Sequence, residues 1–246
     1  MKIYPSLSED LAAFAHAQPL LLTATSPTHA PHVNLSPKGL SSHFAVLSPT
    51  TVAYVDRTGS GCETISHLYE NGRLTLMFLS FGPSPRILRL FCTGRVVEYT
   101  DPAFRGYLDE IAAVRRRAGG EGRVEFEGAR AVIVGDIWRV TTSCGFSVPM
   151  VPGGAEAFAE RDTLDRYIAQ TEKAGQMQAY QAEHNARSLD GLPGLRAARR
   201  GAGEALLGWG DVRSRAGRLW AERVSVFFGF LLAVLGYVVG RRLGLL

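Results

Sequence analysis

A turn at 57–61 is the stretch of this sequence whose residues are best suited to bind a ligand. It combines an arginine, a threonine, a serine and two glycines, so it offers guanidinium, hydroxyl and backbone N–H donors. Apolar side chains at Ile65, Leu68 and Tyr69 have helical spacing, which predicts a helix over 63–70 directly after the turn. Free N–H groups at a helix start attract anions. The pattern therefore predicts either an anion site or a plain strand-to-helix turn, and it matches neither the P-loop nor the dinucleotide fingerprint.

Short apolar runs on both sides of this turn predict the elements that position it. Strands are expected over 20–25, 32–36, 44–47, 51–55, 74–78, 86–99 and 129–142. Helices are expected over 101–118 and 161–187, and near the N-terminus with Ser6 as N-cap. Turn-length gaps between successive strands favour a mainly β protein, a closed antiparallel barrel with helical additions. Within it, residues 37–39 are expected to end the second strand, and Gly94 to form a bulge or bend.

The positive charge of the chain is concentrated at its C-terminal end. The 246 residues carry a net charge of +4, while 196–223 hold seven arginines against three acidic residues, and Arg241 and Arg242 follow. This last part of the chain therefore carries +6, and 1–195 carries about −2. A body without excess positive charge argues against nucleic-acid binding.

Cysteine and histidine usage predicts neither disulfides nor a metal centre. The three cysteines, at 62, 92 and 144, lie far apart with no CxxC pair, which is typical of a reducing compartment. The six histidines show no metal-ligand spacing, so no metal site is predicted. Cys144 has no histidine or lysine nearby in the sequence, which favours a buried structural cysteine over a reactive thiolate.

Five blocks of the sequence carry a family pattern: HVNLSPKGL (32–40), YVDRTGSGCETISHLYENGRLTLMF (54–78), PRILRLFCTGRVV (85–97), RVTTSCGFSVP (139–149) and SLDGLPGL (188–195). In this order they resemble the pyridoxamine 5′-phosphate oxidase-related family of FMN-binding split β-barrel proteins, and the resemblance covers 1–195. It implies a six-stranded antiparallel split barrel, usually a homodimer with FMN at the subunit interface. The small-molecule substrate stays unknown.

The resemblance also implies which residues approach the flavin: Asn34, Ser36, Lys38, Thr58, Gly59, Ser60, Thr64, Arg89 and Ser143. Ser143 would reach the flavin from the partner subunit, and Arg89 is slightly favoured over Arg86 as a phosphate-binding cation. The true oxidase has an Arg–Lys pair where this sequence has Glu63 and Thr64, and a carboxylate that faced a phosphate would repel it. The Arg-x-His substrate signature of the oxidase is not visible, so oxidation of pyridoxamine phosphate is not expected.

The C-terminal segment 224–240 is apolar and predicts a transmembrane tail anchor. It holds seventeen residues without charge, and as a helix it would span about 25 Å. Arg223 on one side and the pair at 241–242 on the other would anchor it, with the barrel facing the cytosol. The alternative is a buried or oligomerising hydrophobic helix. The expected domains are therefore the FMN-binding barrel (1–195), an arginine-rich linker (196–223) and the anchor (224–240).

Two functions of different class fit these expectations. The first is an FMN-dependent oxidoreductase of unknown substrate, tethered to a membrane, in which the flavin carries out the redox chemistry and no side chain stands out as a catalytic acid or base. The second is a non-catalytic flavin-binding or interaction module at a membrane. A third interpretation replaces FMN with a deazaflavin or haem, with His32 and His67 as the only candidate haem ligands.

Overall fold

The computed structural model describes residues 1–119, 126–205 and 223–242. Its contacts divide the chain into two compact units, Met1–Leu206 and Leu207–Leu246. Most of the expected arginine-rich linker lies outside the described residues. The first unit carries the sheet and every predicted flavin-binding residue.

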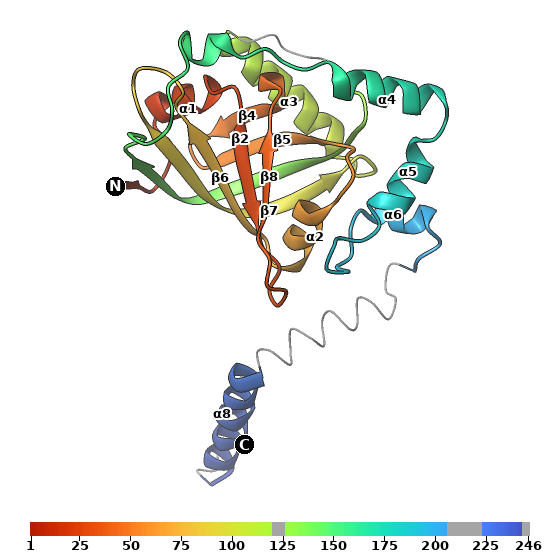
Figure 1. Ribbon diagram of the computed structural model, residues 1–246. Coiled ribbons are helices and arrows are strands. Elements are labelled where there is room, and N and C mark those ends of the chain that lie inside the picture. Colours follow the sequence, from red (N-terminus) through yellow and green to blue (C-terminus); the bar gives the residue numbers. More distant parts are fainter. Residues whose placement is uncertain (120–125, 206–222, 243–246) are drawn as a thin grey trace. The chain divides into compact units, whose positions relative to one another are not determined.

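An antiparallel β-sheet is the framework of the first unit (Figure 1). Its strands are β1 (Lys2–Tyr4), β2 (Leu21–Thr25), β3 (Asn34–Lys38), β4 (Phe44–Ser48), β5 (Thr51–Arg57), β6 (Arg73–Leu79), β7 (Ile87–Glu98) and β8 (Ala129–Ser143). Neighbouring strands follow the order β3-β2-β6-β7-β8-β5-β4, and β1 pairs with β8. The mainly β, antiparallel architecture with helices is therefore confirmed, although the described part of the chain has eight strands in this sheet and not six.

Strand β8 accommodates the additional strands because it is long enough to hold several partners. β7 pairs with it along one edge, while its other edge is shared by β5 over 129–136 and by β1 over 140–142. Pro37 lies within β3, at the edge of the sheet, where one side of the strand needs no ladder hydrogen bond. β3 ends at Lys38, within the predicted residues 37–39, but Pro37 does not break the strand.

Helices of the first unit are α1 (Glu9–His16), α2 (Glu63–Glu70), α3 (Phe104–Arg117), α4 (Thr163–Lys173), α5 (Met177–His184) and α6 (Arg196–Gly201), with short 3-10 turns at Ser41–His43 and Gly154–Ala157. α2 has the predicted bounds. α1 begins later than predicted, because Ser8 is its N-cap and the Ser8 Oγ accepts the Leu11 N–H at 3.3 Å. The helix predicted over 161–187 is divided into α4 and α5 near Gly175, whose φ of +67° is typical of a helix end.

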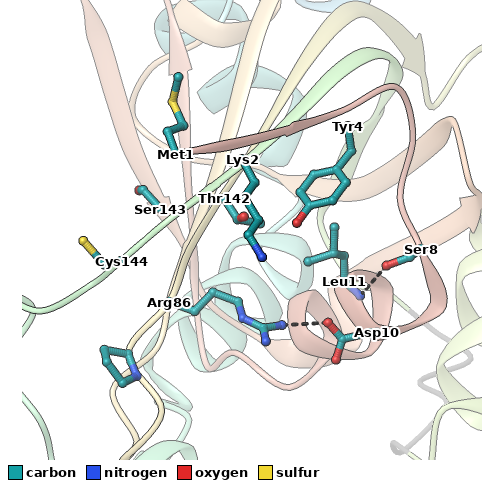
Figure 2. A pocket seen from close by; sticks show the side chains of 11 residues that line it. Met1, Lys2, Tyr4, Ser8, Asp10, Leu11, Arg86, Thr142, Ser143 and Cys144 are labelled. Carbon is teal, nitrogen blue, oxygen red and sulfur yellow. Dashed lines mark hydrogen bonds and ion pairs between the residues drawn. The ribbon is translucent and has the colours of Figure 1, made fainter.

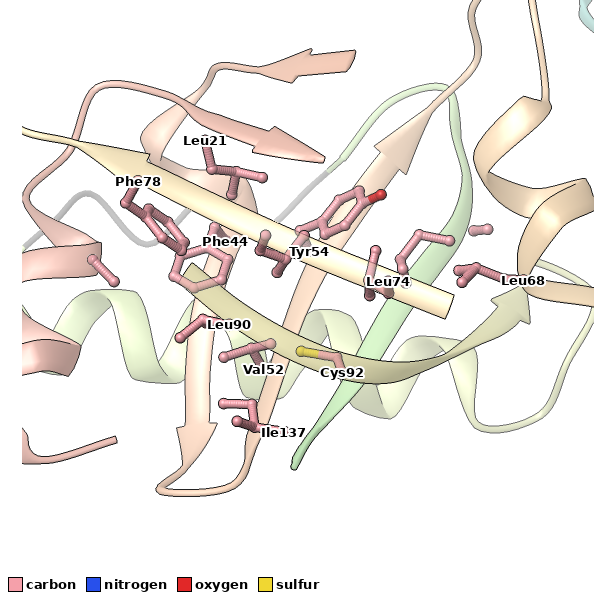
Figure 3. Close-up of a cluster of buried hydrophobic side chains, with 14 of the residues drawn as sticks. Leu21, Phe44, Val52, Tyr54, Leu68, Leu74, Phe78, Leu90, Cys92 and Ile137 are labelled. Carbon is pink, nitrogen blue, oxygen red and sulfur yellow. The ribbon is translucent and has the colours of Figure 1, made fainter. Parts of the chain in front are cut away.

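Two groups of buried apolar side chains stabilise the sheet. The larger includes Phe44, Tyr54 and Phe78, and the rings of Phe44 and Phe78 lie 5.0 Å apart between centroids (Figure 3). The smaller lies between the sheet and α3, which contributes Leu108 and Ile111. With both faces of β5 covered, residues of this strand are buried from Val52 onward. A polar side chain at the end of β5 is therefore placed in an apolar surrounding.

Gly94 in β7 allows α2 to pack closely on the sheet. A Cβ at this position would lie 2.6 Å from Leu68 Cδ2 of α2 and 3.1 Å from Leu74 Cβ of β6. Gly94 pairs regularly with β8, and the register shift of β7 lies between Phe91 and Cys92. The predicted bulge at Gly94 is therefore wrong, because the glycine is needed for a close approach and not for a bend.

Helix α8 (Arg223–Arg242), in the second unit, occupies the segment predicted to cross a membrane. Among the described residues, no helix is long and apolar enough to do so. The prediction of a transmembrane helix is therefore wrong, and with it the prediction of a membrane-anchored barrel facing the cytosol.

Candidate functional site

A buried carboxylate between two cations forms the centre of the candidate site. Asp56, near the end of β5, is only 2% exposed. Its Oδ1 accepts a hydrogen bond from Lys38 Nζ at 3.0 Å, and its Oδ2 accepts one from Arg130 Nε at 2.8 Å. Burial by itself would raise the pKa of Asp56, but the charges of Arg130 and Lys38 outweigh burial and lower this pKa to about 2. Two cations and one anion leave this cluster with a net charge of +1.

Arg130 reaches Asp56 because of a β-bulge. Asp56 pairs with Ala131 and the next residue of β5 pairs with Ala129, so Arg130 is the extra residue on β8. Its Nη1 is buried and has no hydrogen-bond partner among the described residues. Sequence reasoning missed Arg130; the available signal was one arginine between two alanines at the start of an apolar strand.

Hydroxyl and amide groups from three elements meet beside this cluster. Asn34 Nδ2, on β3, donates to Thr25 Oγ1 of β2 and to Thr64 Oγ1 of α2, each at 3.0 Å. Ser36 Oγ donates to Asn34 Oδ1 at 3.2 Å. The structure therefore brings together three predicted site residues, and Lys38 lies at the end of the same strand.

Tyr54 adds a buried phenol to the same region. Lys38 Nζ lies 5.9 Å from the centroid of the Tyr54 ring, and Tyr54 is two residues before Asp56 on β5. Burial raises the pKa of Tyr54, and the charge of Asp56 raises it further. Tyr54 is therefore a neutral phenol at physiological pH, surrounded by the core shown in Figure 3.

The turn before α2 is held by the C-terminal part of the first unit. Thr58 Oγ1 donates to the carbonyl oxygen of Gly128 at 3.0 Å and accepts from Gln181 Nε2 at 2.9 Å. Asn185 Nδ2 donates to the carbonyl oxygen of Gly59 at 2.9 Å. Thr58 and Gly59 are thus engaged by α5 and its C-cap, and α5 fixes the path of the turn.

The start of α2 leaves its first backbone N–H groups available. Cys62 is the N-cap residue, and its side chain makes no capping hydrogen bond within the described structure. The Glu63 carboxylate lies against this turn, since its oxygens are the atoms that a Cβ at Gly61 would meet, and its Oε1 also accepts the Leu189 N–H at 3.3 Å. Ser60 is exposed in the turn, and burial raises the pKa of the Cys62 thiol to about 11. The helix start therefore combines backbone donors and a protonated thiol with one carboxylate.

The two remaining predicted residues form a separate pair. Arg89 Nη1, on β7, donates to Ser143 Oγ, on β8, at 3.2 Å. Ser143 and Arg86 line a pocket of about 470 Å³, where Arg86 Nη1 also donates to Asp10 Oδ2 at 2.8 Å (Figure 2). Within the described structure, Arg89 and Ser143 share no hydrogen-bond partner with the Asp56 cluster.

Cys144 lines the same pocket beside Ser143 (Figure 2). It is exposed, whereas Cys62 and Cys92 are buried. The expectation of a buried structural cysteine at 144 is therefore wrong, because this residue follows the end of β8 and leaves the sheet.

The fold and site define an antiparallel β protein with helices and a buried basic cluster beside a helix start. No family model matches the chain. The chain is 45% identical over 250 residues to the "Pyridoxamine 5'-phosphate oxidase family protein ustO" of Aspergillus flavus, covering 98% of this chain and 96% of the relative. The chain therefore belongs to the pyridoxamine 5′-phosphate oxidase family, and the resemblance seen in its sequence is confirmed.

Solved structures similar to this chain include HupZ of Group A Streptococcus, with 18% identity and a TM-score of 0.41 over 55% of this chain and 98% of HupZ. An FMN-binding protein of Syntrophomonas wolfei has 14% identity and a TM-score of 0.38 over 57% of this chain and 86% of its own. An F420 reductase has 15% identity and a TM-score of 0.37 over 55% of this chain and 98% of its own.

Proposed function

We propose that this protein binds FMN and is a flavin-dependent oxidoreductase. The Asp56 cluster with its two cations, together with the start of α2, would hold the FMN phosphate. The observation that carries this proposal is that Arg130 Nη1 is buried without a hydrogen-bond partner among the described residues. It belongs to a cluster of net charge +1 in which Asp56 and Arg130 are buried and Lys38 is partly exposed. A buried, uncompensated charge is unfavourable, and a phosphate offsets it.

Family membership and the five sequence blocks favour FMN over a simple anion at this site. When bound, the flavin supplies the hydride or electron transfer. The chain's own residues bind and orient it: Asn34 and Ser36 on β3, and Thr64 at the start of α2, present hydroxyl and amide groups next to the cluster. Tyr54, held neutral by burial, adds no negative charge beside the phosphate.

The first test is the visible absorption spectrum of the full-length protein purified without added cofactor. A flavin spectrum, with FMN in the heat-released supernatant, is the expected result. Lys38→Gln should weaken FMN binding at least about tenfold, since it removes one of the two cations from the anion site. Arg95→Gln is the matched control, because Arg95 is an exposed cation on β7 that pairs with Asp136. A colourless protein that ignores added FMN contradicts the proposal.

Turnover distinguishes an enzyme from a binding module. Under anaerobic conditions, NADH or NADPH should bleach the bound flavin of an oxidoreductase. Flavin that stays oxidised with both donors supports instead the second candidate, a non-catalytic flavin-binding module. If NADH or NADPH does reduce the flavin, the substrate is sought among compounds that reoxidise the reduced protein.

We also propose that the protein acts as a homodimer in which Ser143 approaches the flavin of the partner subunit. The separation of the Arg89–Ser143 pair from the Asp56 cluster supports this arrangement. Light scattering should give twice the mass of the chain. Mixing Lys38→Gln with Ser143→Ala subunits should restore one complete site, whereas in a monomer neither protein can rescue the other.

A further inference from the structure

Three side chains far apart in the sequence meet beside α2. His67 lies in α2, His32 in the loop between β2 and β3, and Asp190 in the loop after α5. Each offers one nitrogen or oxygen atom, and these atoms all lie within 4.8 Å of one another. His67 Nε2 is 3.8 Å from Asp190 Oδ1, and the two imidazole centroids are 5.5 Å apart.

The Nε2 atom of His67 is left without a suitable partner by its surroundings. His67 is fully buried, and its Nδ1 is 2.9 Å from Thr25 Oγ1, which fixes the ring. If Nε2 carries the proton, the nearest carboxylate oxygen is too far for a hydrogen bond. If Nε2 carries the lone pair, that lone pair faces a carboxylate. Either tautomer therefore leaves a buried polar atom unpaired, as is observed.

His32 repeats this situation beside His67. Its Nε2 is also buried and has no hydrogen-bond partner in the described part of the chain. Two histidines, each with an unpaired buried nitrogen, therefore lie next to one carboxylate.

We propose that His32, His67 and Asp190 bind a divalent transition-metal ion, with zinc as the best match. Two imidazoles and one carboxylate form a common zinc ligand set, and the fourth position of a tetrahedral site remains for water. Ligand atoms in such a site lie about 3.4 Å apart, so the separations between these atoms need to shorten by at most about 1.4 Å.

The neighbours of these ligands are those of a metal site. Thr25 Oγ1 holds the second nitrogen of His67, and Ser188 Oγ donates to Asp190 Oδ1. Partners of this kind orient the ligands of metal centres. The ion would join α2 to the loop before β3 and to the loop after α5. Thr25 Oγ1 also accepts a hydrogen bond from Asn34 Nδ2 at 3.0 Å, so this site adjoins the proposed flavin site. The three metal ligands are distinct from the proposed flavin-binding residues, and the metal proposal does not depend on flavin binding.

The test uses the full-length, tag-free protein after chelator treatment. Zinc titrated in a calorimeter should bind with one ion per chain, and cobalt should produce the visible absorption bands of a four-coordinate site. His32→Gln and Asp190→Asn should each weaken zinc binding at least about tenfold. His29→Gln is the matched control, because His29 is an exposed residue of the same loop.

Thermal unfolding keeps the proposal testable if a variant folds poorly. Zinc should raise the Tm of the wild-type protein and of His29→Gln, and leave the Tm of His32→Gln unchanged. The proposal is overturned if the wild-type protein binds neither ion, or if His32→Gln binds zinc as tightly as His29→Gln. These measurements are made with and without FMN, so failure of the flavin proposal leaves their outcome readable.

Discussion

Two arginine–carboxylate pairs of this protein have the same length and opposite surroundings. Arg130 Nε and Asp56 Oδ2 are 2.8 Å apart, as are Arg86 Nη1 and Asp10 Oδ2. The side chains of the first pair are 6% and 2% exposed, and those of the second are 38% and 75% exposed. Distance alone therefore says nothing about what each pair does for the fold or for a ligand.

The two pairs differ in how far their charges are buried, and this decides how strongly each charge depends on its partner. Around Asp56, charges are poorly solvated, so each must be matched by a partner and any surplus attracts a ligand. Around Asp10, water screens the charges, and the pair adds little to stability. The Asp56 end of the sheet is therefore suited to hold a phosphate, whereas the Arg86 pocket in Figure 2 is an exposed surface feature.

Removing Arg130 should have the largest effect on the free energy of unfolding. Arg130→Met leaves Asp56 buried with only Lys38 as a charged partner, and we expect the free energy of unfolding to fall by about 3 kcal/mol. Urea denaturation followed by circular dichroism measures the change. An unchanged urea midpoint would show that Asp56 is not stabilised by Arg130.

Packing of α2 against the sheet should give the next largest effect. Gly94→Ala places a Cβ against Leu68 and Leu74, so we expect a loss of about 2 kcal/mol in the free energy of unfolding. Gly106→Ala is the matched control: Gly106 lies in α3 with no atom within 4 Å of an added Cβ, and alanine there should stabilise by about 0.5 kcal/mol. Equal effects of the two substitutions would contradict the close approach of α2.

His16, which lies outside the candidate site, tests how burial of a titratable group changes stability with pH. Burial, followed by the charge of Arg115, lowers the pKa of His16 to about 4, and its Nε2 accepts the Val46 N–H at 3.0 Å. Between about pH 6.5 and pH 4 the unfolded chain binds a proton that the folded chain does not, so stability falls as the pH is lowered.

The expected loss over that window is on the order of 2 kcal/mol, allowing for partial exposure of His16. Denaturant melts at several pH values measure it. His16→Gln should flatten the dependence in this window, and a dependence equal to that of the wild type would assign the effect to other groups.

Breaking the exposed pair should have the smallest effect. Arg86→Met should change the free energy of unfolding by less than about 1 kcal/mol, because Asp10 stays solvated after its partner is removed. The same urea experiment measures it beside Arg130→Met. A loss as large as that of Arg130→Met would remove the distinction between the two regions.

Local patterns were sufficient for most of the secondary structure. The spacing of Ile65 and Leu68 and the stop at Asn71 gave α2 its correct bounds, since these signals act within one or two turns of the chain. The strands from β2 to β8 were found for the same reason, whereas the three-residue β1 was missed. Where a residue depended on distant neighbours, prediction failed: Gly94 serves the packing of Leu68, and Pro37 is tolerated because β3 is an edge strand.

The candidate site divides in the same way. Asn34, Ser36, Lys38 and Thr64 were found from the family blocks; the structure brings Asn34, Ser36 and Thr64 together and joins Lys38 to Asp56. Their roles in binding a flavin stay predictions. The same holds for Thr58, Gly59, Ser60, Arg89 and Ser143. The third partner of the charged cluster, Arg130, was missed because a bulge between two strands directs it to Asp56.

The sequence by itself determined the antiparallel β class, the helix start beside a donor-rich turn, and the family. Each of these depends on residue type and on spacing over a few positions. Only the tertiary structure decided which charges are buried together and that His32, His67 and Asp190 meet. These contacts join residues that are 18 to 158 positions apart. Strand pairing and loop packing determine such contacts, so the spacing of residues along the chain does not predict them.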